Sequence, residues 1–308
     1  MASLTVAENS TKTSIEPWFI PFDIFIIFCN VLSVTFAIFF LIVIISDRTC
    51  RTVPMMLVGN SCFSTLMFAI AMLIVTSLTL EKDLKRIEYY DSLCVFGGYF
   101  SHVTCAAQNY SFLLQAIHRY LLIVHPSRSF WHSYRIHILF ICLSWIFVFV
   151  FPMQYLFTGQ IVYNANNQVC EMHHKLSFSV IYMGLCLFGI PVSMIHFMYL
   201  ILVRYVKKMN TVVTPNKTLV RARRNLKIIR RTVILISIVV TVCFPYQLFV
   251  VMSFFNREPK YNFRIAYIFG ETSKLCVLIT LFLLTDHLKT AVMKMITKST
   301  HMITPRAL

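Results

Sequence analysis

Two charged side chains stand inside an otherwise apolar segment near the end of the chain. Glu271 and Lys274 are three residues apart, so a helix places them on one face. They can neutralise each other as an ion pair, or one of them can bind a charged ligand. Both interpretations apply if the ion pair forms at rest and a ligand opens it. Arg119 is another candidate, because it is a strong cation at the inner end of a long apolar segment, where it needs water or a partner.

The sequence patterns of common enzyme and metal sites are missing from the chain. No G-x-x-x-x-G-K-[ST], H-E-x-x-H or C-x-x-C occurs, and the seven glycines form no phosphate-binding loop. We therefore expect no enzymatic activity, no catalytic residues, no bound metal and no cofactor. The chemistry that remains is the recognition of ligands and partners.

The composition indicates that lipid surrounds most of the chain. Of the 308 residues, 58% are hydrophobic and 13% are charged, whereas a soluble domain is about a quarter charged. Seven segments reach the length of about 20 mostly apolar residues that a membrane-crossing helix needs. They are Trp18–Ile45, Val53–Leu80, Leu93–Ile117, Ile136–Phe157, Leu176–Val203, Thr232–Phe255 and Ile265–Thr285. The predicted fold is an all-α integral membrane protein, a seven-transmembrane helix bundle.

Two short regions are expected to flank this bundle. We divide the chain into an N-terminal tail over 1–17, a membrane domain over 18–286 and a last region over 287–308. In the last region apolar residues recur at helical spacing with lysines between them, which predicts a short amphipathic helix on the inner leaflet. The apolar residues are Leu288, Val292, Met295 and Ile296.

The distribution of Lys and Arg predicts the orientation in the membrane. Nineteen of these residues fall in the loops on one side and eight on the other. Positively charged loops stay in the cytoplasm, so the N-terminus is predicted to be extracellular. The net charge of +16 follows from this topology, and we expect contact with membrane lipid and no nucleic-acid partner. Asn9-Ser10-Thr11 is then an extracellular sequon, which predicts glycosylation of Asn9.

Topology also sorts the ten cysteines. Only Cys94, at the start of the third segment, and Cys170, in the second outer loop, face the oxidising side. We therefore predict a disulfide between them. Two free thiols are the alternative.

Several motifs occupy related positions in this plan. His118-Arg119-Tyr120 lies in the first inner stretch after the third segment, and Arg119 follows Cys94 by 25 residues, which is about 37 Å of helix and places them at opposite faces of the membrane. Further landmarks are Trp145, Pro191, Tyr199, Pro245 and Tyr246. With the seven segments, the outer N-terminus and the predicted disulfide, residues 18–298 resemble the rhodopsin-like (class A) G-protein-coupled receptors, as a divergent member.

The chain departs from that family in three places. Thr65 stands where the family usually carries a sodium-binding aspartate, so sodium modulation is not expected. No tryptophan precedes Pro245, and the Asn-Pro-x-x-Tyr motif of the seventh helix is missing.

The resemblance implies a location in the plasma membrane and two functional sites. An outer ligand pocket is expected from Ser101, His102, Cys105, Tyr246, Gln247, Glu271 and Lys274. Because Ser101 replaces the aspartate of the family's amine receptors, a monoamine ligand is not expected. At the inner face, coupling to a heterotrimeric G protein is expected from His118, Arg119, Tyr120 and Tyr199.

The second outer loop bears on the ligand class. Between Gln160 and Glu171 two β-prone runs flank an Asn/Ala turn, which predicts a hairpin. Peptide-binding members of the family resemble this, so a peptide is the favoured ligand. Two other functions stay open. A secondary transporter would need paired acids or broken helices at mid-membrane, and a retinal photopigment would use a seventh-helix lysine such as Lys274.

Overall fold

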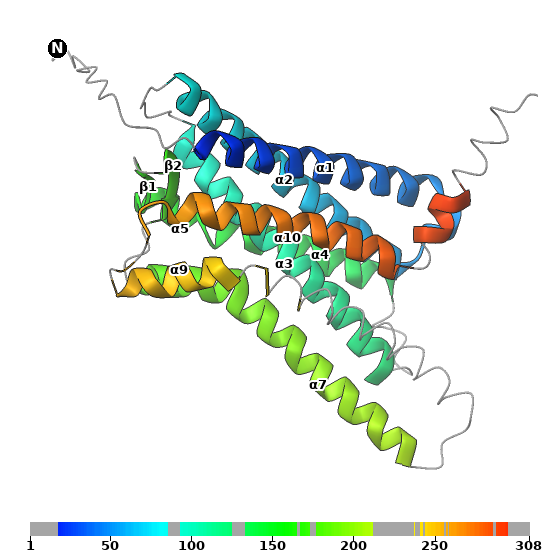
Figure 1. The fold of residues 1–308 in the computed structure, drawn as a ribbon. Helices are drawn as coiled ribbons and strands as arrows, with labels where there is room; N and C mark the ends of the chain where they lie inside the picture. Colours follow the sequence, from blue (N-terminus) through cyan, green and yellow to red (C-terminus); the bar gives the residue numbers. More distant parts are fainter. Residues whose placement is uncertain are drawn as a thin grey trace, which may run out of the picture.

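The computed structural model describes residues 18–85, 93–124, 133–164, 167–172, 177–211, 237, 241–242, 244–255, 257, 259–285 and 288–294. Figure 1 shows a bundle of helices with one small β-hairpin at the end where the first helix begins. The transmembrane elements are α1 (Phe19–Ser46), α2 (Val53–Lys85), α3 (Cys94–Val124), α4 (Tyr134–Val150), α6 (Phe178–Gly184), η3 (Leu185–Gly189), α7 (Ile190–Thr211), α9 (Phe244–Phe254) and α10 (Asn262–Leu284). Three short elements join them: η1 (Arg48–Cys50), α5 (Met153–Phe157) and the hairpin of β1 (Ile161–Asn164) and β2 (Val169–Met172).

These elements correspond to the seven predicted segments. Within the described part of the chain, five helical stretches combine the length and apolar composition that a membrane crossing needs. α3 is also long enough, but it is more polar than these five stretches. Its polar residues are buried against neighbouring elements. α9 is the described part of the sixth segment. α6, η3 and α7 together form the fifth. The predicted seven-helix fold is confirmed.

The cores of the two halves of the bundle meet along α3. One apolar cluster joins α3 to α1, α2, α7 and α10, and a second joins α3 to α4, α5, the hairpin and η3. Polar side chains cross between helices within these layers. Gln108 donates to Thr65 Oγ1 at 3.3 Å, Gln115 donates to Ser61 Oγ at 2.7 Å, and Trp145 donates to Asn60 Oδ1 at 3.0 Å. Lipid offers no partners, so these groups must satisfy one another.

Two helix ends extend beyond the predicted segments at the outer side of the bundle. α2 continues to Lys85 and α10 begins at Asn262. The prediction that Asp83 and Arg264 lie in loops is therefore wrong, and both are buried. Arg264 binds both carboxylate oxygens of Asp83, at 2.5 and 3.1 Å, and one oxygen of Asp23 at 3.1 Å. Burial is possible because the charges pair, and the pairing joins α1, α2 and α10.

The hairpin is fixed to this outer end by several bonds. β1 and β2 are antiparallel, with Tyr163 opposite Cys170, as the loop sequence predicted. The predicted disulfide between Cys94 and Cys170 is present, with Cα atoms 5.4 Å apart. Arg264 Nε donates to the carbonyl of Asn167, just before β2, at 3.1 Å. The hairpin is thus connected both to α3 and to α10.

Gly98 allows β2 to lie directly on α3. A Cβ atom at this position would be 2.4 Å from the carbonyl oxygen of Cys170 and 3.0 Å from Cγ2 of Ile161. The first of these atoms belongs to the backbone and cannot rotate away. At the neighbouring Gly97 the nearest atom would be Cγ2 of Val75 at an ordinary 3.5 Å.

The helix that follows α10 packs on the bundle. Residues 288–294 are helical, and Leu288 and Val292 are buried in the same cluster as α1 and α2, so this apolar face covers protein. Figure 1 shows this helix beside the end of α1. Asp47 accepts a hydrogen bond from the Thr49 amide at 2.9 Å, which lowers the pKa of the Asp47 carboxyl. Met295, Ile296 and the tail lie outside the described residues.

We predict that Gly98→Ala displaces the hairpin and destabilises the protein, by about 1–3 kcal/mol as for other overpacked sites. The change should lower the thermal unfolding midpoint of the purified protein and reduce surface delivery. Gly97→Ala is the matched control, because its added methyl group meets only an ordinary contact. Equal unfolding midpoints for the two variants would contradict the close approach of β2 to α3.

Candidate functional site

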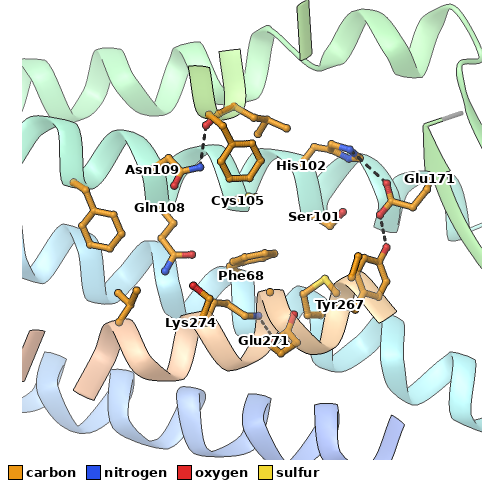
Figure 2. Close-up of a pocket in the computed structure, with 18 residues that line it drawn as sticks. Phe68, Ser101, His102, Cys105, Gln108, Asn109, Glu171, Tyr267, Glu271 and Lys274 are labelled. Carbon is orange, nitrogen blue, oxygen red and sulfur yellow. Dashed lines mark hydrogen bonds and ion pairs between the residues drawn. The ribbon is translucent and has the colours of Figure 1, made fainter. Parts of the chain in front are cut away.

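A cavity of about 120 Å³ lies in the outer half of the bundle, and we call it the central pocket. Its walls belong to α2, α3, η3, β2 and α10. The residues labelled in Figure 2 are Phe68, Ser101, His102, Cys105, Gln108, Asn109, Glu171, Tyr267, Glu271 and Lys274. Acidic, basic and aromatic groups therefore converge on one small space, which is the usual form of a ligand site.

The ion pair of Glu271 and Lys274 forms one side of the central pocket. Both side chains are buried, at 2% exposure, and the Lys274 ammonium contacts the Glu271 carboxylate. Lys274 also donates to Asn30 Oδ1 of α1 at 3.0 Å and lies 4.0 Å from the ring centroid of Phe68. The charge of Lys274 is therefore compensated by a carboxylate, an amide oxygen and an aromatic face.

A second charged group lies across the pocket, on the hairpin. Glu171 accepts a hydrogen bond from the Tyr267 hydroxyl, and its other carboxylate oxygen is 3.5 Å from Nε2 of His102. His102 Nδ1 is 2.6 Å from the carbonyl of Gly98 and donates to it. Nε2 therefore faces Glu171, and Figure 2 shows the three side chains in a row.

A local irregularity of the fifth transmembrane helix borders the same pocket. η3 has π-helical geometry, and Pro191 stands two residues after its end. Proline has no amide hydrogen, so the carbonyl four residues earlier, that of Leu187, loses its usual α-helical donor. Asn109 Nδ2 of α3 donates to this carbonyl at 2.9 Å. The proline thus creates an acceptor that fixes α3 against the fifth helix, and such π segments often border functional sites.

Five of the seven predicted ligand-binding residues line the central pocket. They are Ser101, His102, Cys105, Glu271 and Lys274. The Ser101 hydroxyl donates to the Gly98 carbonyl at 2.8 Å, within its own helix turn. Tyr246 and Gln247 belong to α9, but their side chains lie outside the described residues, as does the predicted glycosylation site Asn9.

Sequence reasoning missed several residues of the pocket wall. Glu171 and Tyr267 were not predicted, although Glu171 directly follows Cys170 and the disulfide therefore brings it to the top of α3. Tyr267 lies four residues before Glu271, on the same helix face. Gln108 and Asn109 carried a signal too, because amides in a membrane segment need partners inside the protein.

The predicted coupling residues lie at the other end of α3. Tyr120 of α3 and Tyr199 of α7 both pack against the buried pair Ile123 and Leu202. Arg119 is half-buried in the same helix turn. α3 thus runs from the central pocket to this inner cluster, with Ser101 and Arg119 on one continuous helix.

His118 makes an interhelical contact beside Arg119. Its Nδ1 is 2.8 Å from Nε2 of His137 in α4, and both rings are buried. His137 Nδ1 is 3.1 Å from the carbonyl of Ser133 and donates to it, so His137 Nε2 must be the acceptor and His118 Nδ1 the donor. A chain of two hydrogen bonds therefore connects α3 to the first turn of α4.

A seven-helix bundle with a pocket toward one end and a cluster of tyrosines beside Arg119 at the other has the architecture of a transmembrane receptor. The chain belongs to the rhodopsin family of such receptors, because the sequence model described as "7 transmembrane receptor (rhodopsin family)" matches residues 36–285. The resemblance seen in the sequence is confirmed.

A solved structure supports the same fold. The crystal structure of squid rhodopsin superposes with a TM-score of 0.76 over 94% of this chain and 88% of that one, at 15% sequence identity. No curated protein sequence matches the chain at a significant level. At this identity the superposition is evidence for the fold alone.

We predict that reversing one charge of the buried pair is more harmful than reversing both. Glu271→Lys or Lys274→Glu leaves two like charges in contact, and breaking a buried pair costs about 3–5 kcal/mol. Each single variant should lose most surface expression and thermal stability, and the double variant should recover part of both. If the double variant is no more stable than the single variants, the contacts with Asn30 and Phe68 require the ammonium to stand at position 274.

Proposed function

We propose that the protein transduces an extracellular ligand to a heterotrimeric G protein across the plasma membrane, with its N-terminus outside. The observation that carries the proposal is α3, which lines the central pocket with Ser101 and His102 and presents Arg119 at the opposite end. Arg119 follows Ser101 by 18 positions, which is about 27 Å of helix. A ligand that shifts α3 therefore alters the inner cluster directly.

The favoured ligand is a peptide, for which the pocket offers a small anchoring site. At about 120 Å³ the pocket is smaller than the roughly 300 Å³ and more that whole drug-sized ligands occupy. A single inserted side chain fits this volume, and the rest of a peptide would lie on the hairpin. Glu171 on one side and the Glu271–Lys274 pair on the other supply charged contacts for such a side chain.

The residues fit the two alternative functions less well. A retinal chromophore would need Lys274 as its attachment point, but Lys274 is engaged by Glu271 and Asn30 in a cavity of about 120 Å³. A transporter would need a polar path near mid-membrane. The polar groups at that depth bond to one another, Gln108 to Thr65 and Lys274 to Glu271 and Asn30, so they form closed contacts within the bundle.

A second-messenger panel in transfected cells tests the proposal. Cells expressing the receptor are exposed to a library of short peptides, and responses through each G-protein class are recorded. Glu171→Gln is expected to weaken the response to an active peptide at least several-fold, because the change removes a buried charge from the pocket wall while keeping its shape. Silence in every assay despite verified surface expression would contradict the proposal.

The inner end of α3 also bears on the resting state of the receptor. In most of the family an aspartate precedes the arginine and pairs with it, whereas here the neighbour is His118. The His118 side chain carries no carboxylate that could pair with Arg119, and it bonds to His137. If a surface ion pair contributes about 1 kcal/mol to the resting state, its loss raises the active fraction about fivefold.

We predict measurable signalling in the absence of ligand. His118→Asp should reduce it toward background by supplying the carboxylate, and Arg119→Ala should abolish it. His118→Asn is the control, since it breaks the histidine pair without adding a charge. Basal signalling should be measured at matched surface density. Equal signals from wild type and His118→Asp would mean that packing elsewhere sets the resting state.

A further inference from the structure

Two hydrogen-bond acceptors face each other in the wall of the central pocket. His102 Nδ1 donates to the Gly98 carbonyl at 2.6 Å, and a neutral imidazole that donates from Nδ1 carries only a lone pair on Nε2. This Nε2 atom lies 3.5 Å from one carboxylate oxygen of Glu171. A lone pair and a carboxylate oxygen repel each other unless a donor bridges them. The contact is therefore incomplete without a further hydrogen-bond donor.

The negative charge of Glu171 has no cation of its own in the described part of the chain. Its other carboxylate oxygen accepts a hydrogen bond from the Tyr267 hydroxyl, which is a neutral donor. The ion pairs that the described lysines and arginines form are with other carboxylates. The Glu171 side chain is 8% exposed, so water compensates little of its charge. Buried charges of this kind are stable only with a partner.

The lysine of the central pocket is committed to the opposite wall. The Lys274 ammonium contacts the Glu271 carboxylate, Asn30 Oδ1 at 3.0 Å and the face of the Phe68 ring, whose centroid is 4.0 Å away. These three contacts occupy the three donors of an ammonium group. The charges of Lys274 and Glu271 cancel each other, so Glu171 gives the described lining a net negative charge when His102 is neutral.

The neighbouring polar side chains do not supply the missing donor. Ser101, Gln108 and Asn109 donate to oxygen atoms of the protein, at 2.8, 3.3 and 2.9 Å. Among the described residues no group of three His, Cys, Asp or Glu side chains could hold a metal ion here. Water can supply a donor but no positive charge, whereas an ammonium or guanidinium group supplies both.

Glu171 and His102 are accessible from open space. Both line the central pocket, and Figure 2 shows them with Tyr267 along one edge of it. Glu171 also lines a second cavity, of about 260 Å³, between the outer halves of α2 and α3. Neither of the two facing atoms is fully enclosed by protein. A bound group can therefore reach both acceptors.

We propose that Glu171 and His102 form a cation site that selects ligands with a basic group, an ammonium or guanidinium with at least two N–H donors. One N–H binds the Glu171 oxygen and another binds His102 Nε2, so the cation bridges the two acceptors. On a peptide this group is a lysine or arginine side chain or the N-terminal amine. The inference rests on the proposed function, because it names the group by which the extracellular ligand is recognised.

Ligand-observed NMR on the full-length receptor in phosphatidylcholine nanodiscs tests the proposal without a G protein. The probes are n-butylguanidinium, n-butylammonium, n-butyltrimethylammonium and pentanoate, and empty nanodiscs give the background. The first two should bind saturably at about 10 mM or below, as small fragments with good contacts do. n-Butyltrimethylammonium carries the charge but no N–H, so it should bind about tenfold more weakly. Pentanoate, an anion, should not bind.

Variants locate the cation site. Glu171→Gln keeps the shape of the side chain and removes its charge, so it should weaken n-butylguanidinium binding about tenfold. His102→Phe keeps a ring without Nε2 and should weaken binding several-fold. Glu81→Gln is the matched control, because it removes the same charge from an exposed side chain of α2 that pairs with Lys85. If Glu171→Gln fails to fold, the probe series on the wild type decides.

Three results would overturn the proposal. They are the absence of saturable n-butylguanidinium binding, equal binding of n-butyltrimethylammonium, and equal binding to the wild type and Glu171→Gln. The last result would mean that His102 itself neutralises Glu171. A receptor that binds the two N–H cations as expected but stays silent in every second-messenger assay supports the cation site and contradicts the proposed function. A receptor that signals but binds neither cation does the reverse.

Discussion

The structure depends on the pairing of buried charges at the outer end of the bundle, above all on Arg264. Its guanidinium extends from α10 and binds the carboxylates of Asp23 in α1 and Asp83 in α2. It also donates to the backbone carbonyl of Asn167, next to β2. Such charges are stable away from water only with their partners in place. The contact therefore sets how α1, α2, α10 and the hairpin meet, and the position of the hairpin in turn places Glu171 in the pocket wall.

The same requirement explains why α3 is the central helix. It is the most polar of the long helices, and its amides and histidines find partners on four other elements: Thr65 and Ser61 on α2, His137 on α4, the Leu187 carbonyl on η3 and Glu171 on β2. Each bond fixes one neighbour at one height along α3. The helix thereby runs without a break from the central pocket to the cluster of Ile123 and Leu202.

The sequence was informative where a signal is local. Apolar length predicted the helices, the position of two cysteines predicted the disulfide, and spacing placed Glu271 beside Lys274. Reasoning failed for Arg264 and Asp83, which looked like loop charges because their partners are far away in the chain. The cavity between α2 and α3 was also not predicted, because it forms only where β2 lies against α3.

The anchored hairpin has a consequence for the wall of the central pocket. The disulfide, the close approach at Gly98 and the bond to Arg264 attach it at separate points, so it cannot swing aside as a free loop does. Glu171 is therefore held in place before anything enters the central pocket, and little ordering entropy is left to lose at this wall on binding.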